Sequence, residues 1–211
     1  MKKLLIFLAS IFFMTPAVFA VPAVQVYIPG ADWDASTQTW ITYSSDFELQ
    51  VITSSGDTKP IYNLTLVTSL GPDETPTDGA ISINGIDYND FTYGTPPEFG
   101  DNASGYPPHG TFPANYFELE LAALVNDAPH VVMDMQPGED GTDMGRIFIL
   151  NISTSYENVH FDAHGFYREI DGKFTFAPFS HDGQKTIPEP GTLTLFGLGI
   201  AGAGIYRRFK K

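Results

Sequence analysis

The sequence predicts an all-β domain, built as a two-sheet antiparallel β-sandwich of the jelly-roll or immunoglobulin-like kind. Two observations predict this class. Several short stretches alternate apolar and polar side chains with the period of two that half-buried strands show. Turn-forming residues separate these stretches, as at Asn84-Gly85 and Asp171-Gly172. Many short strands between turns that contain Gly or Pro favour a sandwich over a barrel.

The alternation places the expected strands one by one. Phe47, Leu49 and Val51 would point to one side of a strand, and Glu48 and Gln50 to the other. The same pattern covers residues 61–70, 116–121, 146–152, 159–167 and 173–179.

Two segments depart from the strand pattern. Residues 119–126 hold Ala and Leu without a helix breaker, which predicts a short helix. Residues 87–115 interleave proline with aromatic side chains, which predicts a long loop packed on the domain.

The first 20 residues have the three regions of a secretory signal peptide. Lys2 and Lys3 give a positive start, residues 4–13 are apolar, and Val18-Phe19-Ala20 is a small-residue cleavage pattern. The apolar run is shorter than the roughly 17 to 25 residues of a spanning helix. We therefore expect a signal helix that passes the secretory translocon and is removed by signal peptidase after Ala20.

Residues 21–186 would then form one extracellular domain. The chain contains no cysteine, which excludes disulfide and thiol chemistry. Residues 21–187 hold 24 acidic side chains against five basic ones, a formal charge of −19. Such a field repels phosphate backbones, so we expect no nucleic-acid partner. It is compatible with divalent cations, with high salt or simply with solubility outside the cell.

Residues 187–211 predict a sorting and anchoring tail. Pro188-Glu189-Pro190 should be extended, because proline disfavours helix at the residue before it. Residues 192–206 are apolar or small and would form a short transmembrane helix of about 22 Å, a marginal span against roughly 30 Å of hydrocarbon. A closing basic cluster should stay in the cytoplasm as a stop signal: Arg207, Arg208, Lys210 and Lys211.

These three parts, in this order, resemble the PEP-CTERM sorting signal of Gram-negative bacteria. In that family exosortase, an integral-membrane cysteine transpeptidase, removes the tail, and the cargo goes to the cell surface or the exopolysaccharide matrix. The resemblance implies exosortase as a partner and a membrane-inserted intermediate. An ordinary anchor that is never processed is the alternative.

The middle of the chain resembles the choice-of-anchor N proteins. The resemblance lies in Pro107-Pro108-His109-Gly110, in Val159-His160-Phe161-Asp162 and in residues 176–182. That family shares an extracellular domain attached to interchangeable anchors, and the resemblance implies no activity.

Histidine and aspartate recur in one expected strand. His160, Asp162 and His164 would share one strand face, but the two histidines would be about 13 Å apart, too far for one ion. A transition metal would need a ligand from another segment, and structural hydrogen bonding is the alternative. Ser180-His181-Asp182 has the residue types of a hydrolase triad, yet alternate side chains face opposite ways. We expect no catalytic residue.

Acidic turns are the remaining candidates for a cofactor. Calcium takes six to eight oxygen ligands, which such turns supply, although no helix-loop-helix calcium motif is present. A structural calcium is therefore the one cofactor considered, with a solvated acidic turn as the alternative. The candidate ligands are Asp73 and Asp78 in one segment, and Glu139, Asp140 and Asp143 in another.

The expected function is that of a non-enzymatic surface or exopolysaccharide-matrix protein. An exported hydrolase or carbohydrate-binding protein that acts on matrix polysaccharide is the alternative. Trp33 and Trp40 could form a flat platform for sugar rings, but such aromatics more often fill the end of a core.

Overall fold

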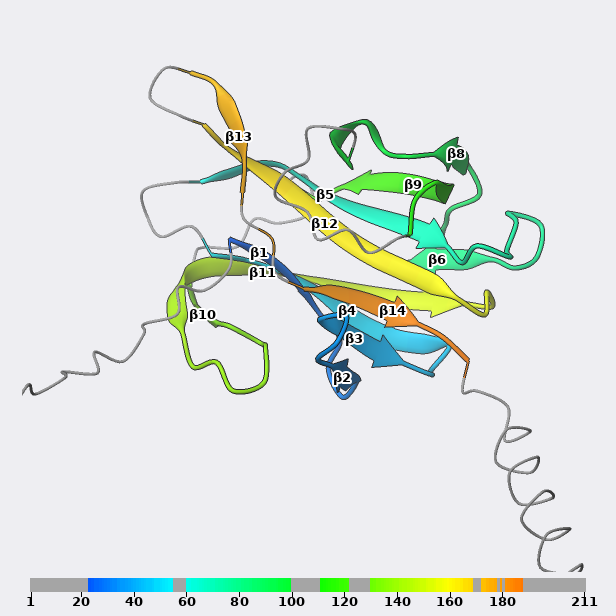
Figure 1. Ribbon diagram of the computed structural model, residues 1–211, viewed down its shortest axis with the longest axis horizontal. Coiled ribbons are helices and arrows are strands. Elements are labelled where there is room, and N and C mark those ends of the chain that lie inside the picture. The colour runs from blue at the N-terminus through cyan, green and yellow to red at the C-terminus, as the bar shows by residue number, and fades with distance from the viewer. Residues whose placement is uncertain are drawn as a thin grey trace, which may run out of the picture.

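A computed structural model describes residues 23–54, 60–99, 111–121, 130–168, 172–177, 179 and 181–187. Within these ranges the chain forms two β-sheets and a 3₁₀ turn at Pro97–Phe99, and no α-helix (Figure 1). No helix of the described part is long and apolar enough to cross a bilayer. The all-β prediction is confirmed there, whereas the expected signal helix and transmembrane helix lie outside the described residues.

The first sheet has six strands. Its order is β1-β4-β11-β6-β7, and β10 also pairs with β11. The strands are β1 (Val24–Tyr27), β4 (Asp46–Ser54), β6 (Ile81–Ile83), β7 (Ile86–Asp87), β10 (His130–Met133) and β11 (Thr142–Thr154).

The second sheet has eight strands. Its order is β2-β3-β14-β12-β5-β9-β8, and β13 also pairs with β12. The strands are β2 (Asp32–Asp34), β3 (Thr39–Thr42), β5 (Ile61–Leu70), β8 (Thr92–Gly94), β9 (Ala114–Glu120), β12 (Val159–Arg168), β13 (Phe174–Phe176) and β14 (Asp182–Lys185).

One strand pair departs from the expected antiparallel arrangement. β14 pairs antiparallel with β12 but parallel with β3. More than a hundred residues separate β3 from β14 along the chain, so no hairpin fixes their relative direction. The sandwich is therefore mixed, and the choice between jelly-roll and immunoglobulin-like topology stays a prediction.

The core lies between the two sheets. Leu49 and Val51 of β4 and Leu150 of β11 belong to the same buried cluster as Leu66 of β5 and Phe161 of β12. The period-two pattern of the sequence therefore holds in the structure, because each strand turns alternate side chains toward the opposite sheet. This shared core is consistent with the expected sandwich.

Two local expectations were wrong in part. β9 continues to Glu120 and the Leu121 amide bonds to the Leu64 carbonyl, so residues 119–121 are not helical, while residues 122–126 of the expected helix lie outside the described residues. The segment 87–115 is not loop throughout, since it contains β8, which pairs with the start of β9. Pairing with a neighbouring strand outweighed helix propensity in the first case, and three residues are too few to show a period in the second.

Candidate metal centre

Three polar residues of β12 project away from the main core. Val159, Phe161 and Ala163 belong to the core cluster, so the residues between and after them, His160, Asp162 and His164, lie on the opposite face of the sheet. All three are buried nevertheless, with His160 9% and Asp162 1% exposed. The predicted sharing of one strand face is confirmed.

Asp182 reaches the same face from the neighbouring strand. In the register of β14 on β12, Gly183 is opposite Phe161 and Gln184 is opposite His160. A Cβ on Gly183 would contact Val26 and Ile28, which places Gly183 toward the core and Asp182 away from it. The Asp182 side chain is 0% exposed.

His160, Asp162 and Asp182 converge on one point. The His160 Nε2 atom lies 3.4 Å from Asp162 Oδ2 and 3.4 Å from Asp182 Oδ2. One ligand atom from each residue lies within 4.8 Å of the others, which makes this the one such cluster of three metal-ligating side chains in the described part of the chain. Moreover, none of the described residues donates a hydrogen bond to the buried Asp162 Oδ1 atom.

The electrostatics of this cluster favour a cation. Burial lowers the pKa of His160, but the two carboxylates outweigh it and raise that pKa to about 10. Two buried carboxyl groups thus face one imidazole ring. Because a metal-bound histidine must be neutral, a cation bound here would replace the proton on His160.

An open pocket borders the cluster on the His160 side. Its volume is about 400 Å³, and its lining includes His160, Gln184, Asn158 and Asp73. A small ion therefore reaches the edge of the cluster from solvent without passing through the main core.

His164 lies outside the cluster, as the strand spacing predicted. Its Nε2 atom is 3.7 Å from Glu118 Oε1, and its ring contacts those of Phe166 and Phe176. Burial lowers the pKa of His164 to about 4, so this ring is neutral near pH 7. One ion cannot take both histidines of β12.

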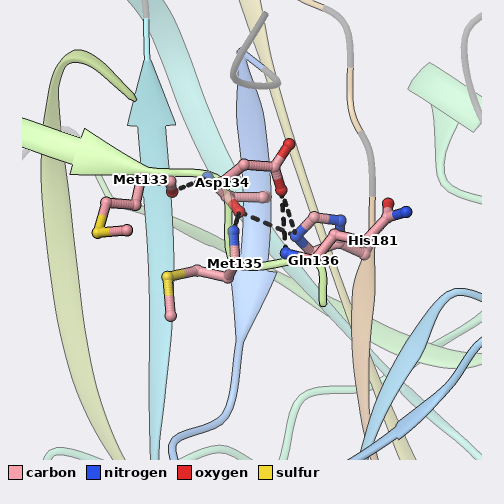
Figure 2. A network of polar contacts seen from close by, with 6 residues as sticks. Met133, Asp134, Met135, Gln136 and His181 are labelled. Atoms are coloured by element: carbon pink, nitrogen blue, oxygen red, sulfur yellow. Dashed lines mark hydrogen bonds and ion pairs between the residues drawn. The ribbon is translucent and has the colours of Figure 1, made fainter. Parts of the chain in front are cut away.

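His181 takes part in a separate polar network between the sheets (Figure 2). His181 Nε2 lies 2.9 Å from Gln25 Oε1 and 4.0 Å from Asp134 Oδ1. Gln25 Oε1 also accepts the Met135 amide at 3.0 Å, and Gln25 Nε2 donates to the Met133 carbonyl at 2.8 Å. His181 and Asp182 thus serve different networks, and Ser180 lies outside the described residues.

None of the predicted calcium ligands belongs to the cluster of three. Asp78 Oδ2 accepts the amide and hydroxyl of Thr75 at 2.6 and 2.8 Å, and these bonds lower its pKa. Asp143 Oδ1 accepts the Met144 amide at 2.7 Å. Asp73 lines the pocket beside His160, while Glu139 and Asp140 belong to the turn after Gly138.

The two tryptophans pack into the domain. Trp40 is buried, and the ring of Trp33 lies 4.9 Å from that of Trp40 and 5.5 Å from that of His181. Tyr27 packs edge-on against Trp40. These rings fill one end of the core, which was the alternative to a flat sugar platform.

Sequence reasoning assigned Asp182 to the wrong grouping. It was considered only beside its neighbours in Ser180-His181-Asp182, whereas its partners lie on β12. The usable signal was the pair of polar residues two apart in each segment, His160 with Asp162 and Asp182 with Gln184. Their meeting depends on the register of β14 on β12, which no local pattern specifies.

Comparison with known proteins concerns the tail that follows β14. The family model of the PEP-CTERM protein-sorting motif matches residues 186–211. The motif implies exosortase-dependent sorting of an exported protein through a membrane-anchored intermediate. No curated protein matches the chain. The motif residues themselves, Pro188, Glu189 and Pro190, and the basic cluster lie outside the described residues.

Proposed function

We propose that the chain is a non-enzymatic protein of the cell surface or exopolysaccharide matrix, displayed after exosortase removes its tail. The observation that carries this proposal is the match of the sorting motif to residues 186–211, directly behind the last strand. Signal peptidase and the translocon act first, at the expected signal peptide. The resemblance to choice-of-anchor N proteins agrees with a display domain joined to an exchangeable tail.

The position of the motif supports the proposal that the folded domain does not need its tail. Lys185 is buried, its Nζ donates to the carbonyls of Tyr156 and Glu157, and the Thr186 amide bonds to the Thr42 carbonyl. The network of the folded part therefore extends to Thr186. Cleavage in the following segment removes none of the strands.

The burial of the convergent carboxylates supports display over hydrolysis. A glycosidase holds its two carboxyl groups about 5 to 9.5 Å apart on either side of a bound sugar. Asp162 and Asp182 are closer to each other than this and are shielded from any polymer. A hydrolase of matrix polysaccharide would need a different pair.

A second candidate function is binding of the matrix polysaccharide. A pocket of about 410 Å³ combines the carboxylates of Asp87, Asp90 and Glu118 with the rings of Tyr88 and Tyr116. On the edge strand β8, whose Thr92 lines this pocket, Tyr93 is 71% exposed. Carboxylates that accept sugar hydroxyls, next to exposed aromatic rings, suit a neutral glycan.

The processing step is tested in a host that encodes exosortase. The intact mass of the exported protein shows where its chain ends, and we expect the mass to lack the apolar and basic parts of the tail. Pro188→Ala with Pro190→Ala should retain the full tail in the membrane fraction. Pro137→Ala, in an exposed turn, is the matched control and should be processed normally. Equal shortening in cells without exosortase contradicts the proposal.

The display step is tested on the mature protein. We expect no turnover on a panel of polysaccharide, peptide and ester substrates, and retention of the protein on the producing cells or their matrix. Binding on a glycan array that Tyr93→Ala and Asp90→Asn abolish would favour the second candidate. Hydrolysis of any polymer at a rate that survives repurification would refute the non-enzymatic assignment.

A further inference from the structure

We propose that His160, Asp162 and Asp182 bind one divalent transition-metal ion, with Zn²⁺ the best fit. The proposal is independent of the tail, because all three ligands lie within β12 and β14. One imidazole nitrogen and two carboxylate oxygens are a donor set that zinc takes in proteins. Calcium fits less well, since it takes six to eight oxygen ligands.

The spacing of the His160 nitrogen from each carboxylate matches a tetrahedral ion. Zinc holds nitrogen and carboxylate oxygen at about 2.0–2.2 Å, which places neighbouring ligand atoms roughly 3.3–3.6 Å apart. His160 Nε2 lies 3.4 Å from an oxygen of each carboxylate. These distances are long for charge-assisted hydrogen bonds, which are about 2.7–2.9 Å. Both spacings are those of two ligands around one zinc ion, and both exceed the usual length of such a hydrogen bond.

The surroundings supply the second, independent observation. Asp162 is 1% exposed, and no described residue donates a hydrogen bond to its Oδ1 atom. An ion between the carboxylates would give this buried oxygen a partner. The pocket beside His160 gives an ion an entry path and leaves room for a fourth ligand.

The consequence is a structural staple across two strands. Two ligands come from β12 and the third from β14, the last strand of the sheet, which ends just before the sorting motif. The chain has no cysteine, so a metal is the remaining means of cross-linking this strand. Bound metal therefore stabilises β14, the strand that directly precedes the sorting tail.

Metal content and thermal stability test the site on the exported protein. Ions are first removed with chelator, and zinc is then added back to the metal-free protein. We expect the protein to take up one Zn²⁺ per chain, by elemental analysis and by calorimetric titration. The melting temperature should rise by about 5 to 10 °C when free zinc exceeds its Kd 100-fold. Co²⁺ in place of zinc should give the intense visible bands of a tetrahedral site.

Near-isosteric variants assign the ion to its ligands. Asp162→Asn and Asp182→Asn should each weaken zinc binding by at least about 100-fold and remove the cobalt bands. His164→Gln, on the same strand face but outside the cluster, is the matched control and should keep both. The chain contains five histidines, and zinc can bind adventitiously at those outside the cluster. A loss of zinc in the His164→Gln control would reveal such binding.

Three results would overturn the proposal. One is a wild-type protein whose melting temperature and cobalt spectrum are unchanged by the metal. Another is zinc binding of equal strength in the Asp162→Asn and Asp182→Asn variants. Stabilisation by calcium alone that survives both substitutions would place the cation at another site and also reject this one. If a variant fails to fold, the wild-type cobalt spectrum still decides.

Discussion

Replacing Gln25 with leucine should destabilise the domain far more than the change in side-chain shape suggests. The buried amide of Gln25 bonds to the Met133 carbonyl, the Met135 amide and His181 (Figure 2). Leucine has a similar volume but offers none of these bonds. Three polar groups would lose this partner inside the domain.

The magnitude follows from the number of groups affected. Each buried polar group that loses its partner costs about 1–3 kcal/mol, so Gln25→Leu should lower the free energy of unfolding by at least about 3 kcal/mol. Gln50→Leu is the matched control. Gln50 lies on the adjacent strand β4, opposite Tyr27, and its amide bonds only to Glu48 among the described contacts. Its loss should cost less than about 0.5 kcal/mol.

Urea unfolding followed by tryptophan fluorescence measures both variants, because Trp33 packs against His181. The slope of the unfolding free energy against urea should not change, which shows that the native fold is kept. Hydrogen exchange at the Met135 amide gives a local readout and should accelerate. If Gln25→Leu and Gln50→Leu differ by less than about 0.5 kcal/mol, the network does not hold the sheets together as described.

Three further predictions concern other buried contacts. Gly145→Ala should lower the free energy of unfolding by more than about 2 kcal/mol in urea, because a Cβ there would overlap the Thr53 carbonyl. Ser153→Ala, on the exposed face of β11, is the control and should leave that free energy unchanged. Lys185→Met should lower the melting temperature, since the carbonyls of Tyr156 and Glu157 lose their donor; an unchanged value would show that water replaces the ammonium. Burial, reinforced by Glu74 and Asp78, raises the pKa of Tyr156 above its usual 10, so stability should fall as the pH rises beyond 10. Tyr156→Phe should flatten that alkaline loss, and an identical pH profile would refute the assignment.

The fold could be predicted from the sequence wherever a strand was long and half-buried. β5 and β12 have ten residues each and alternate apolar and polar side chains over part of that length, and both were expected within a residue of their observed bounds. β8 and β14 were missed because three or four residues cannot display a period. The parallel pairing of β14 with β3 is non-local, and turn chemistry says nothing about it.

The candidate site was predictable only in part for the same reason. His160 and Asp162 were placed on one face correctly, since that depends on strand geometry alone. A strand rises roughly 3.4 Å per residue, which separates His160 from His164 by too much for one ion. The need for a ligand from another segment followed from that distance. The identity of that ligand, Asp182, depends on pairing across residues far apart in the chain.

The place of β14 inside the second sheet sets the order of events during secretion. β12 and β3 have β14 between them, so until residues 182–185 have crossed the membrane each presents an open strand edge. Open edges are sites of aggregation, and pairing over more than a hundred residues is slow. If the expected transmembrane helix begins at residue 192, the six residues from 186 to 191 extend at most about 22 Å from it. We would then expect the closing strand to enter the sheet close to the lipid surface, before the tail is removed.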